Sequence, residues 1–267
     1  MLKEKIGFIG AGNIATAIVT GAIRSGYIMP EDIYMYDVVP EILERSATYG
    51  VGVCESATQL CEQCDIVFLT IKPQVYAEVL EEIRLHVTET TVVSVAAGRT
   101  MHYVKSVLGE GTPVIRVMPN TSLLIGRGVT SICRSAEVSD EGLALVRGLF
   151  EASGIAIDLP ERLMNAATAA GGSMPAFVYQ FIRAAMAAAM QEGLEEADAR
   201  QMISATVVGA AQLVQDSDTP LADMIAMVAS PGGTTLAGMK ALEDGGMEPT
   251  VEAAIHAAAK RAAELST

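Results

Sequence analysis

One segment near the start of the chain carries glycines at a spacing that suits the binding of an anionic ligand. Gly10-Ala11-Gly12-Asn13-Ile14-Ala15 follows the apolar run Ile6–Ile9. The glycines allow a tight turn and a close backbone approach, and Ala15 keeps the next helix near its strand. Unpaired N–H groups at a helix start attract phosphate. A glycine turn without a ligand is the alternative, but the pattern favours a dinucleotide site with contacts from Gly10, Ala11, Gly12, Asn13 and Ile14.

Asp37 lies where the sugar of such a dinucleotide is expected. It follows the apolar run Ile33–Tyr36. A carboxylate at the end of the second strand accepts hydrogen bonds from the adenosine ribose and repels a 2′-phosphate. The residues that follow, Val38-Val39-Pro40-Glu41, contain no Arg. Asp37 therefore favours NADH over NADPH, and a carboxylate that caps the next helix is the alternative.

Three further segments place polar residues or glycine directly after apolar runs. They are Thr70-Ile71-Lys72-Pro73-Gln74, Ala96-Ala97-Gly98 and Arg116-Val117-Met118-Pro119-Asn120-Thr121. Open α/β sheets bind ligands beyond the carboxyl ends of their strands. Lys72 suits a ribose or phosphate contact, and Asn120 suits the nicotinamide side of the cleft.

A fourth segment, Ser230-Pro231-Gly232-Gly233-Thr234-Thr235, leads into a helix expected from about Leu236. Successive backbone N–H groups at a helix start form an anion site. That site suits a small carboxylate, and the two threonines add hydroxyl groups. A simple capped helix start is the alternative.

The elements that must position these residues alternate between strand and helix up to about Pro160. Strands are expected at 5–9, 33–36, 66–69, 92–95 and 114–117, with helices such as 13–24 and 74–84 between them. Continuous apolar strands separated by helices predict a doubly wound parallel α/β sheet. We assign residues 1–160 to a Rossmann-type dinucleotide-binding domain.

Beyond Pro160 the strand signals end and Ala-rich helical segments follow. Helices are expected at 177–191, 197–215, 221–228 and 251–265. The uncharged stretch 163–182 contains Gly171, Gly172 and Pro175, which predict two helices meeting in a protein core and not a membrane span. Residues 161–267 are therefore expected to form an all-α domain.

Charge and composition narrow the partners. The 267 residues carry a net charge of −14, which disfavours nucleic acid and anionic membranes as ligands. The mean hydropathy of +0.36 is high and indicates apolar surface buried between subunits. The first residues leave no room for a signal peptide, so we expect a cytoplasmic protein.

The cysteines supply one weaker motif. Cys61-Glu62-Gln63-Cys64 has the spacing of redox and metal sites, but no second pair and no nearby histidine accompanies it. Packing of small apolar side chains is the preferred interpretation, and no metal is expected.

Taken together, the quoted motifs resemble those of the pyrroline-5-carboxylate reductase family. The resemblance spans nearly the whole chain, and the segments R-V-M-P-N-T and S-P-G-G-T-T are its specific parts. It implies NAD(P)H-dependent reduction of a C=N bond, the last step of proline biosynthesis, with NADPH the family's usual cofactor. It also implies a helical domain that dimerises by interleaving, with dimers assembling further.

The resemblance implies particular site residues. Cofactor contacts would come from Thr70, Ile71, Lys72, Pro73, Ala96, Ala97 and Gly98, beside Asp37 and Asn120. Substrate contacts would come from Glu161, Ser230, Gly232, Gly233, Thr234 and Thr235. Because a protonated imine is already a good electrophile, proximity carries most of the catalysis, and Thr235 or a water contacts the ring nitrogen.

Some residues depart from the family pattern. Met174 and Phe177 replace a usual Gly and Tyr, the run Met224–Ala229 is unusually apolar, and Ser122 stands where Pro is common. A related imine reductase with another substrate and a non-catalytic NAD-binding relative are therefore alternatives. The β-hydroxyacid dehydrogenases are disfavoured, because they need a catalytic Lys early in the helical domain and 171–215 contains none.

Overall fold

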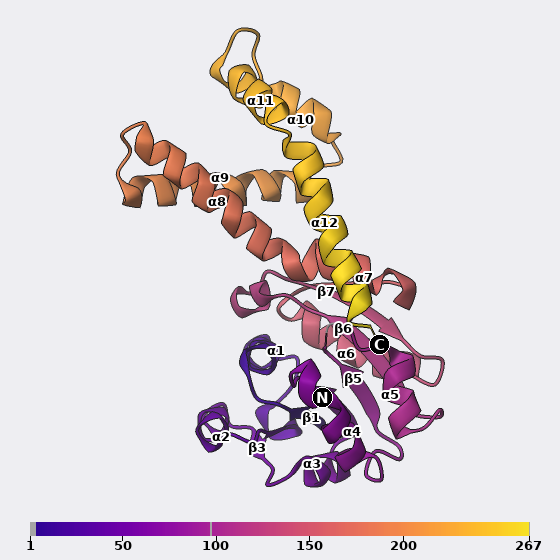
Figure 1. Cartoon of the computed structure of the whole chain (residues 1–267). Coiled ribbons are helices and arrows are strands. Elements are labelled where there is room, and N and C mark those ends of the chain that lie inside the picture. Colours follow the sequence, from indigo (N-terminus) through magenta and orange to yellow (C-terminus); the bar gives the residue numbers. More distant parts are fainter. Residues whose placement is uncertain (1–3, 97, 267) are drawn as a thin grey trace. The chain divides into compact units, whose positions relative to one another are not determined.

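The computed structural model describes residues 4–96 and 98–266. The described chain forms two compact units (Figure 1). The first continues to Pro175 and is rejoined by the chain from Ala257 onward, and the second is Ala176–His256.

An eight-stranded sheet with the order β3-β2-β1-β4-β5-β6-β7-β8 forms the centre of the first unit. The strands are β1 Ile6–Ile9, β2 Ile33–Tyr36, β3 Gly52–Val53, β4 Ile66–Leu69, β5 Thr91–Ser94, β6 Val114–Met118, β7 Gly128–Arg134 and β8 Gly154–Asp158. The pairs are parallel except β6 with β7. Because the chain runs outward from β1 to β3 and then returns to β4, the order reverses between β1 and β4, where open sheets bind ligands.

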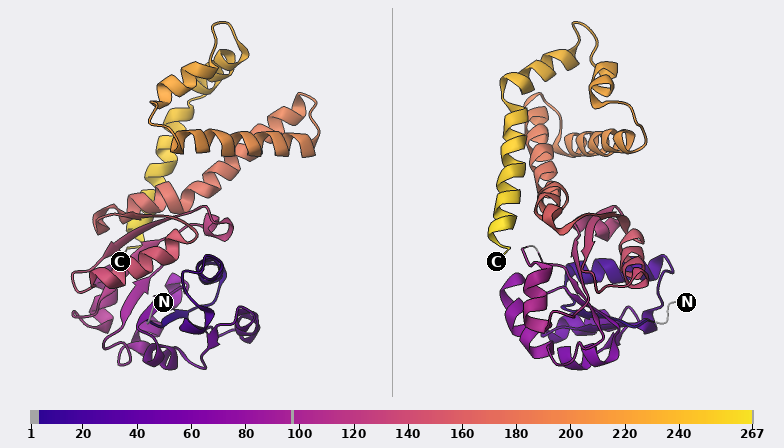
Figure 2. Two further views of the ribbon diagram at one scale, coloured as in Figure 1. Left: turned by 180° about the vertical axis from the view of Figure 1, so that it is seen from behind. Right: turned by 90° about the vertical axis from the view of Figure 1, so that its right-hand side faces the viewer.

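Helices cover both faces of this sheet (Figure 2). They are α1 Asn13–Arg24, α2 Pro40–Ala47, α3 Ala57–Gln63, α4 Tyr76–Ile83, α5 Met101–Leu108 and α6 Asp140–Glu151, with shorter turns η1 Pro30–Asp32, η2 Pro73–Val75 and η3 Thr121–Ile125. Buried side chains of α1 and α6 share one apolar cluster with the sheet, whereas those of α3, α4 and α5 share the other.

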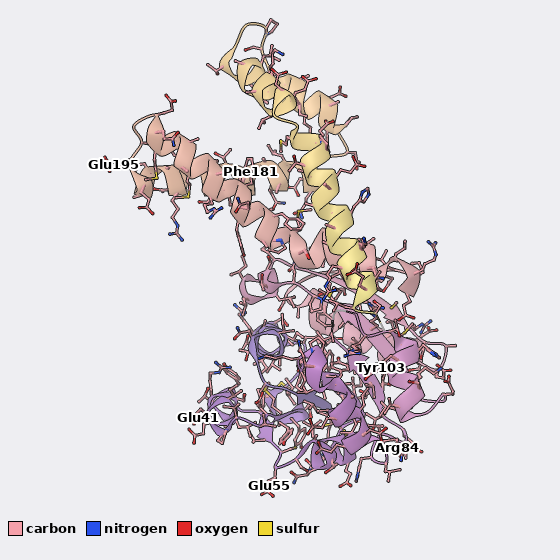
Figure 3. The ribbon with its side chains drawn as sticks, in the orientation of Figure 1. Glu41, Glu55, Arg84, Tyr103, Phe181 and Glu195 are labelled. Atoms are coloured by element: carbon pink, nitrogen blue, oxygen red, sulfur yellow. The ribbon has the colours of Figure 1, made fainter. Side chains whose placement is uncertain are left out.

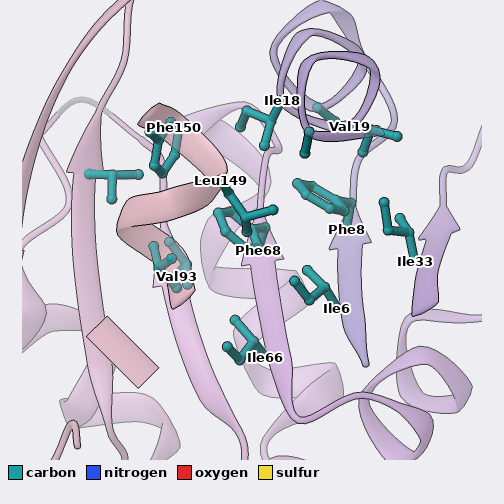
Figure 4. Close-up of a cluster of buried hydrophobic side chains, with 14 of the residues drawn as sticks. Ile6, Phe8, Ile18, Val19, Ile33, Ile66, Phe68, Val93, Leu149 and Phe150 are labelled. Carbon is teal, nitrogen blue, oxygen red and sulfur yellow. The ribbon is translucent and has the colours of Figure 1, made fainter. Parts of the chain in front are cut away.

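The first cluster is built around three aromatic rings (Figure 4). Phe8 of β1 stacks on Phe68 of β4 with ring centroids 4.6 Å apart, and Phe150 of α6 lies 6.2 Å from Phe68. Each such pair adds about 0.5–1.5 kcal/mol beyond the burial of its area. The packing fixes β1 against β4, whose carboxyl ends carry two of the predicted binding segments.

The predicted fold class is confirmed, with differences in detail. Three strands were not predicted, because β3 is very short, β7 mixes Thr130, Ser131 and Cys133 into its apolar pattern, and β8 leaves Ile155 and Ile157 exposed. The antiparallel pairing of β7 also departs from the all-parallel expectation. Strand β5 begins one residue earlier than expected.

The chain passes out of the first unit through η4 Glu161–Leu163, α7 Met164–Ala167 and the π-helical turn η5 Thr168–Ser173. Two helices meeting at a break were expected here. Instead η5 joins α7 to α8 without an interruption in helical backbone. Gly172 lies against the end of the flexible Met118 side chain, 2.5 Å from where a methyl group on this glycine would stand.

The second unit is entirely helical. Its elements are α8 Met174–Gln191, α9 Glu196–Gln215, α10 Leu221–Val228, α11 Thr234–Asp244 and α12 Met247–Glu264, of which the last part of α12 belongs to the first unit. The expected helices are present, although α11 begins two residues before Leu236 and α12 begins before Val251.

Large apolar side chains of this helical unit are exposed in the single chain. Phe181 on α8 is 48% exposed (Figure 3), Val208 on α9 68% and Met227 on α10 79%. In the described parts of α8, α10 and α11 no residue is buried. Among the described residues, no helix combines the length and apolar character that crossing a membrane requires.

Candidate active site

The turn between β1 and α1 is held by hydrogen bonds to the end of β2 and to the turn after β4. Gly10 has φ +91°, and its N–H donates to the Tyr36 carbonyl at 2.8 Å. The Thr70 hydroxyl donates to the carbonyls of Gly10 at 2.6 Å and Ile9 at 3.1 Å. A methyl group on Gly10 would lie 2.8 Å from the Thr70 carbonyl oxygen. Glycine is therefore required here by both backbone conformation and space.

The start of α1 has the form of a phosphate cradle. Gly12 is the N-cap residue and supplies no side-chain hydrogen bond to the helix. A methyl group on Gly12 would meet no atom within 4 Å, so this glycine serves no internal packing contact. Asn13 is exposed, and Ile14 packs against the core. The free N–H groups and the open approach fit a dinucleotide pyrophosphate.

Asp37 braces the same turn. One carboxylate oxygen accepts the Ala11 N–H at 2.8 Å, and the other accepts the Val39 N–H at 3.0 Å, at the N-cap position of α2. Arg45 of α2 also reaches this turn, with Nη2 3.5 Å from the Ala11 carbonyl oxygen. A carboxylate and a guanidinium thus both contact the residue between the two glycines.

The turn after β4 lies beside the glycine turn because β1 and β4 are neighbours. Lys72 in this turn is exposed, and among the described residues it has no acidic partner within salt-bridge distance. Ile71 packs against the second apolar cluster. The Pro73 carbonyl accepts a hydrogen bond from Arg99 at 2.8 Å. Lys72 is therefore free to bind an anion.

The turn after β5 continues this edge of the sheet. Ala96 is buried, and Gly98 is buried with φ +77°. Ala97, predicted to contact the cofactor, lies outside the described residues. Tyr76 ties together the ends of β4 and β5, since its buried hydroxyl donates to the Leu69 carbonyl at 3.0 Å and lies 3.2 Å from the Ser94 hydroxyl. Burial raises the pKa of Tyr76 to about 12, so it stays a neutral hydrogen-bonding group.

Asn120 is placed by internal hydrogen bonds. Its side-chain oxygen accepts the N–H groups of Ser122 and Val129 at 3.2 Å, and its amide donates to the Gly171 carbonyl at 3.2 Å. The residue is 8% exposed. Asn120 therefore joins β6, β7 and η5, a role that the sequence pattern did not reveal.

Glu161 pairs with a buried cation. Its Oε1 lies 3.2 Å from Nη1 of Arg116 and accepts the Met101 N–H at 2.7 Å. Arg116 is 3% exposed and projects from β6. Nearby, burial is the first cause that raises the pKa of Cys133 to about 12, and the Glu161 charge adds to it. Glu161 thus links β6 to the start of α5.

The segment Ser230–Thr235 belongs to the helical unit. Helix α11 begins at Thr234 with Gly233 as its N-cap, and no side chain caps it. Gly232 has φ +72°, and the Gly233 N–H donates to the Ser230 carbonyl at 3.0 Å. The Thr235 hydroxyl makes no hydrogen bond that the structure describes within this unit. The N–H groups and hydroxyls that the sequence predicted are thus presented at a helix start.

The four cysteines are free and buried. Burial is the main cause that raises the pKa of Cys61 to about 12, and the pKa values of Cys54 and Cys64 are also raised mainly by burial. Cys54, Cys61 and Cys64 belong to the second apolar cluster. No group of three or more His, Cys, Asp or Glu side chains in the described chain has an arrangement that could hold a metal ion. These thiols behave as core side chains.

The turns that follow β1, β2, β4 and β5 thus come together at one edge of the sheet, as predicted. Three residues were not predicted to matter. Arg45 becomes a neighbour of Ala11 only through folding, and Arg99 reaches Pro73 in the same way. Arg116 carried a readable signal, because a charged residue inside an apolar strand needs a buried partner.

A doubly wound sheet with a glycine cradle at its switch point is the architecture of a dinucleotide-binding domain, which nicotinamide-dependent oxidoreductases use. Comparisons with known proteins agree. A family model described as NADP oxidoreductase, coenzyme F420-dependent, matches residues 5–98, and one described as pyrroline-5-carboxylate reductase dimerisation matches residues 161–265.

Individual relatives match the chain over nearly its whole length. Pyrroline-5-carboxylate reductase 2 of Bacillus subtilis is 36% identical, covering 98% of this chain and 95% of the relative. The Escherichia coli pyrroline-5-carboxylate reductase is 34% identical over 99% of both chains. The solved structure of a Coxiella burnetii pyrroline-5-carboxylate reductase, 31% identical, aligns over 100% of both chains with a TM-score of 0.93. The Plasmodium falciparum enzyme, solved with NADP bound, is 27% identical and aligns over 100% of both chains with a TM-score of 0.92. The chain belongs to the pyrroline-5-carboxylate reductase family.

Proposed function

We propose that this chain reduces 1-pyrroline-5-carboxylate to proline with NAD(P)H, the last step of proline biosynthesis. The observation that carries the proposal is the sequence identity of 36% and 34% to pyrroline-5-carboxylate reductases over nearly the whole chain. The intact glycine cradle at the switch point of the sheet supports it. When bound, the reduced nicotinamide would supply a hydride to the imine carbon.

The proposed cofactor site follows the edge of the sheet. The N–H groups at Gly12, Asn13 and Ile14 bind the pyrophosphate, supported by Gly10 and Ala11. Asp37 accepts hydrogen bonds from the ribose hydroxyls with the lone pairs that its backbone contacts leave free. Lys72 binds ribose or phosphate, beside Thr70, Ile71 and Pro73. Ala96, Ala97 and Gly98 are assigned to cofactor contacts by the family resemblance, although Ala97 lies outside the described residues. On the nicotinamide side, Asn120 acts by holding the β6–η3 backbone, because its own polar atoms have internal partners.

The proposed substrate site uses the start of α11. The N–H groups near Gly232 and Thr234 hold the carboxylate, helped by Ser230, because the helix start has no side-chain cap of its own. Gly233 shapes this helix start, since its own N–H donates to the Ser230 carbonyl. The Thr235 hydroxyl contacts the ring nitrogen, directly or through water, and orients the iminium. For Glu161, the proposed substrate contact uses its second carboxylate oxygen, because Oε1 is already engaged by Arg116 and the Met101 N–H.

The experiment that tests this assignment compares two imines and two enzymes. Wild type should reduce 1-pyrroline-5-carboxylate far better than 1-pyrroline, which lacks the carboxylate. Thr235→Ala should lower kcat/KM for the carboxylate substrate by about tenfold or more, as expected for a lost hydrogen bond to a charged group. Equal rates with both imines would contradict the carboxylate site, and an unchanged Thr235→Ala variant would remove Thr235 from the mechanism.

A second candidate is a reductase of a bulkier, more apolar imine. It is favoured by helix α10, where Ile225, Met227 and Val228 are exposed and apolar. Met174 and Phe177, which depart from the family pattern, belong to α8. Turnover of a panel of cyclic imines decides between the two candidates. The second candidate requires a higher kcat/KM for an apolar imine than for 1-pyrroline-5-carboxylate.

The proposal extends to organisation and location. We place the functional boundary at Pro160, so that residues 1–160 bind the dinucleotide and 161–267 supply dimerisation and substrate contacts. The exposed apolar helices fit an interleaved homodimer and a higher assembly of dimers. Four free thiols suit the reducing cytoplasm.

A further inference from the structure

The turn between β5 and α5, residues 95–100 apart from Ala97, is held by segments far away in the sequence. Arg99 donates to the Pro73 carbonyl at 2.8 Å, and its guanidinium lies 4.7 Å from the centre of the Tyr103 ring. Where the turn enters α5, Glu161 accepts the Met101 N–H at 2.7 Å. The strand that precedes it is fixed by the hydrogen bond between Tyr76 and Ser94. Contacts therefore secure both ends of the turn.

The middle of this turn rests on the residue that follows α12. A methyl group built on Gly98 would lie 2.6 Å from both Cβ and the carbonyl oxygen of Leu265, and 2.7 Å from its carbonyl carbon. Gly98 also has φ +77°, a conformation that residues with a side chain rarely adopt. The Leu265 side chain itself is 43% exposed. Gly98 therefore faces the Cβ and the carbonyl group of Leu265, and this contact leaves no space for a side chain on Gly98.

The segment that makes this contact is itself anchored. The Leu265 N–H donates to the Arg261 carbonyl at 3.1 Å, continuing the hydrogen bonds of α12. The Ser266 hydroxyl donates to the Ala262 carbonyl at 2.8 Å and to the Asn165 side-chain oxygen of α7 at 3.3 Å. Ala262 is buried. All these residues belong to the same compact unit as the sheet, so Leu265 is held against Gly98 by the body of that unit.

From this geometry we infer that Leu265 and Ser266 are positioning residues for the cofactor. They keep the Gly98 turn in its binding conformation without touching the dinucleotide themselves. The inference rests on the proposed function, which assigns Ala96 and Gly98 to contacts with the cofactor. Glycine has more backbone freedom than other residues, and a support that orders it beforehand lowers the conformational cost of binding a ligand against it. Cofactor affinity therefore depends on a segment far from the glycine cradle.

Two shortened chains test the inference. A stop codon after Glu264 removes Leu265 and Ser266, whereas a stop codon after Ser266 keeps both and serves as the matched control. The dissociation constants of NADH and NADPH are read from nucleotide fluorescence, with melting temperature and oligomeric state measured in parallel. We expect the shorter chain to bind both nucleotides about tenfold more weakly, with kcat at saturating nucleotide within about twofold of the control. Unchanged affinity in the shorter chain would overturn the inference.

A mutant cycle identifies the contact itself. Gly98→Ala introduces the methyl group that overlaps Leu265, so it should weaken nucleotide binding strongly in the full chain. If Leu265 is the supporting neighbour, the two changes are not independent. The shortened chain that also carries Gly98→Ala should then bind nucleotide no more than about twofold worse than whichever single change binds it more weakly. Losses that multiply to about a hundredfold would contradict the contact. Leu265→Ala, which keeps Cβ and the backbone, should bind like wild type.

These readouts separate this inference from the proposed function. Nucleotide affinity is measured without any imine, so an enzyme that binds NAD(P)H but fails to reduce 1-pyrroline-5-carboxylate would overturn the proposed substrate alone. If turnover is normal and removal of Leu265 and Ser266 leaves nucleotide affinity unchanged, only the inference about these two residues is overturned.

Discussion

At the residue scale, Gly10 and Gly12 of the cradle differ in function. Gly10 adopts a positive φ and packs against the Thr70 backbone, whereas Gly12 has a negative φ and open space in front of it. The sequence motif predicts both glycines but does not separate their roles. The structure assigns Gly10 to the fold and leaves Gly12 for the ligand.

Substitution by alanine should separate these duties. Gly10→Ala should lower the free energy of unfolding by about 1–3 kcal/mol through backbone strain and overlap. Gly12→Ala should leave stability within about 0.5 kcal/mol and weaken nucleotide binding by about tenfold or more, because the new methyl group faces the pyrophosphate. Chemical denaturation and nucleotide titration measure the two effects. A destabilised Gly12→Ala variant with normal affinity would refute the assignment.

Cofactor preference is also a matter of single residues. We predict that Asp37 favours NADH by repelling a 2′-phosphate, but Arg45 places a cation beside the same turn. We expect both cofactors to be used. Arg45→Gln should lower kcat/KM with NADPH by about tenfold and change the NADH value by less than about twofold. Asp37→Ala should impair both cofactors, because the Ala11 N–H loses its acceptor. Equal losses with both cofactors in Arg45→Gln would exclude Arg45 from phosphate recognition.

At the element scale, the strands predicted from the sequence are the buried ones. Continuous apolar runs specify β1, β2, β4, β5 and β6, and the glycine motif specifies the start of α1. Strands β7 and β8 were missed because they carry mixed or exposed residues. The π-helical turn η5 was also missed, because its contacts with Met118 and Asn120 come from residues that are distant in the sequence.

Cys61 in helix α3 and Cys64, the C-cap residue of that helix, carry the thiols whose reactivity tests the interpretation of the C-x-x-C segment as packing. Burial raises the pKa of Cys61 from 9.0 to about 12. The neutral thiol is thus favoured in the folded state, and its contribution to stability is complete below about pH 9 and is lost as pH rises toward about 12. The four thiols should resist a disulfide reagent near pH 8 until the chain is unfolded.

The matched control replaces the motif itself. A Cys61→Ala, Cys64→Ala variant should lose less stability than wild type between about pH 9 and pH 11, because it lacks the ionisable groups that unfolding exposes. Rapid modification of Cys61 or Cys64 in the native protein would instead support a redox role for the pair.

At the scale of the whole molecule, the chain is incomplete without a partner surface. Composition indicated apolar surface between subunits, and the helical unit exposes it. Neither the sequence nor a single chain specifies how copies assemble, because the contacting residues lie on different chains.

A charged residue on this surface should disrupt assembly. Val208→Asp places a charge on a side chain that is 68% exposed in the single chain, and burying it between subunits would cost several kcal/mol. We expect light scattering to detect a smaller species with little activity. Lys240→Glu, at a position that is already charged and exposed, should assemble normally. Normal assembly of Val208→Asp would exclude its side of α9 from the interface.

The central claim is tested most directly by turnover of the unmodified protein. Purified enzyme is mixed with 1-pyrroline-5-carboxylate, NADH and NADPH oxidation are followed in parallel, and proline is measured as the product. The account predicts stoichiometric proline formation with both cofactors and a modest preference for NADH from Asp37. Absence of proline with either cofactor, from protein that binds nucleotide, would contradict the claim.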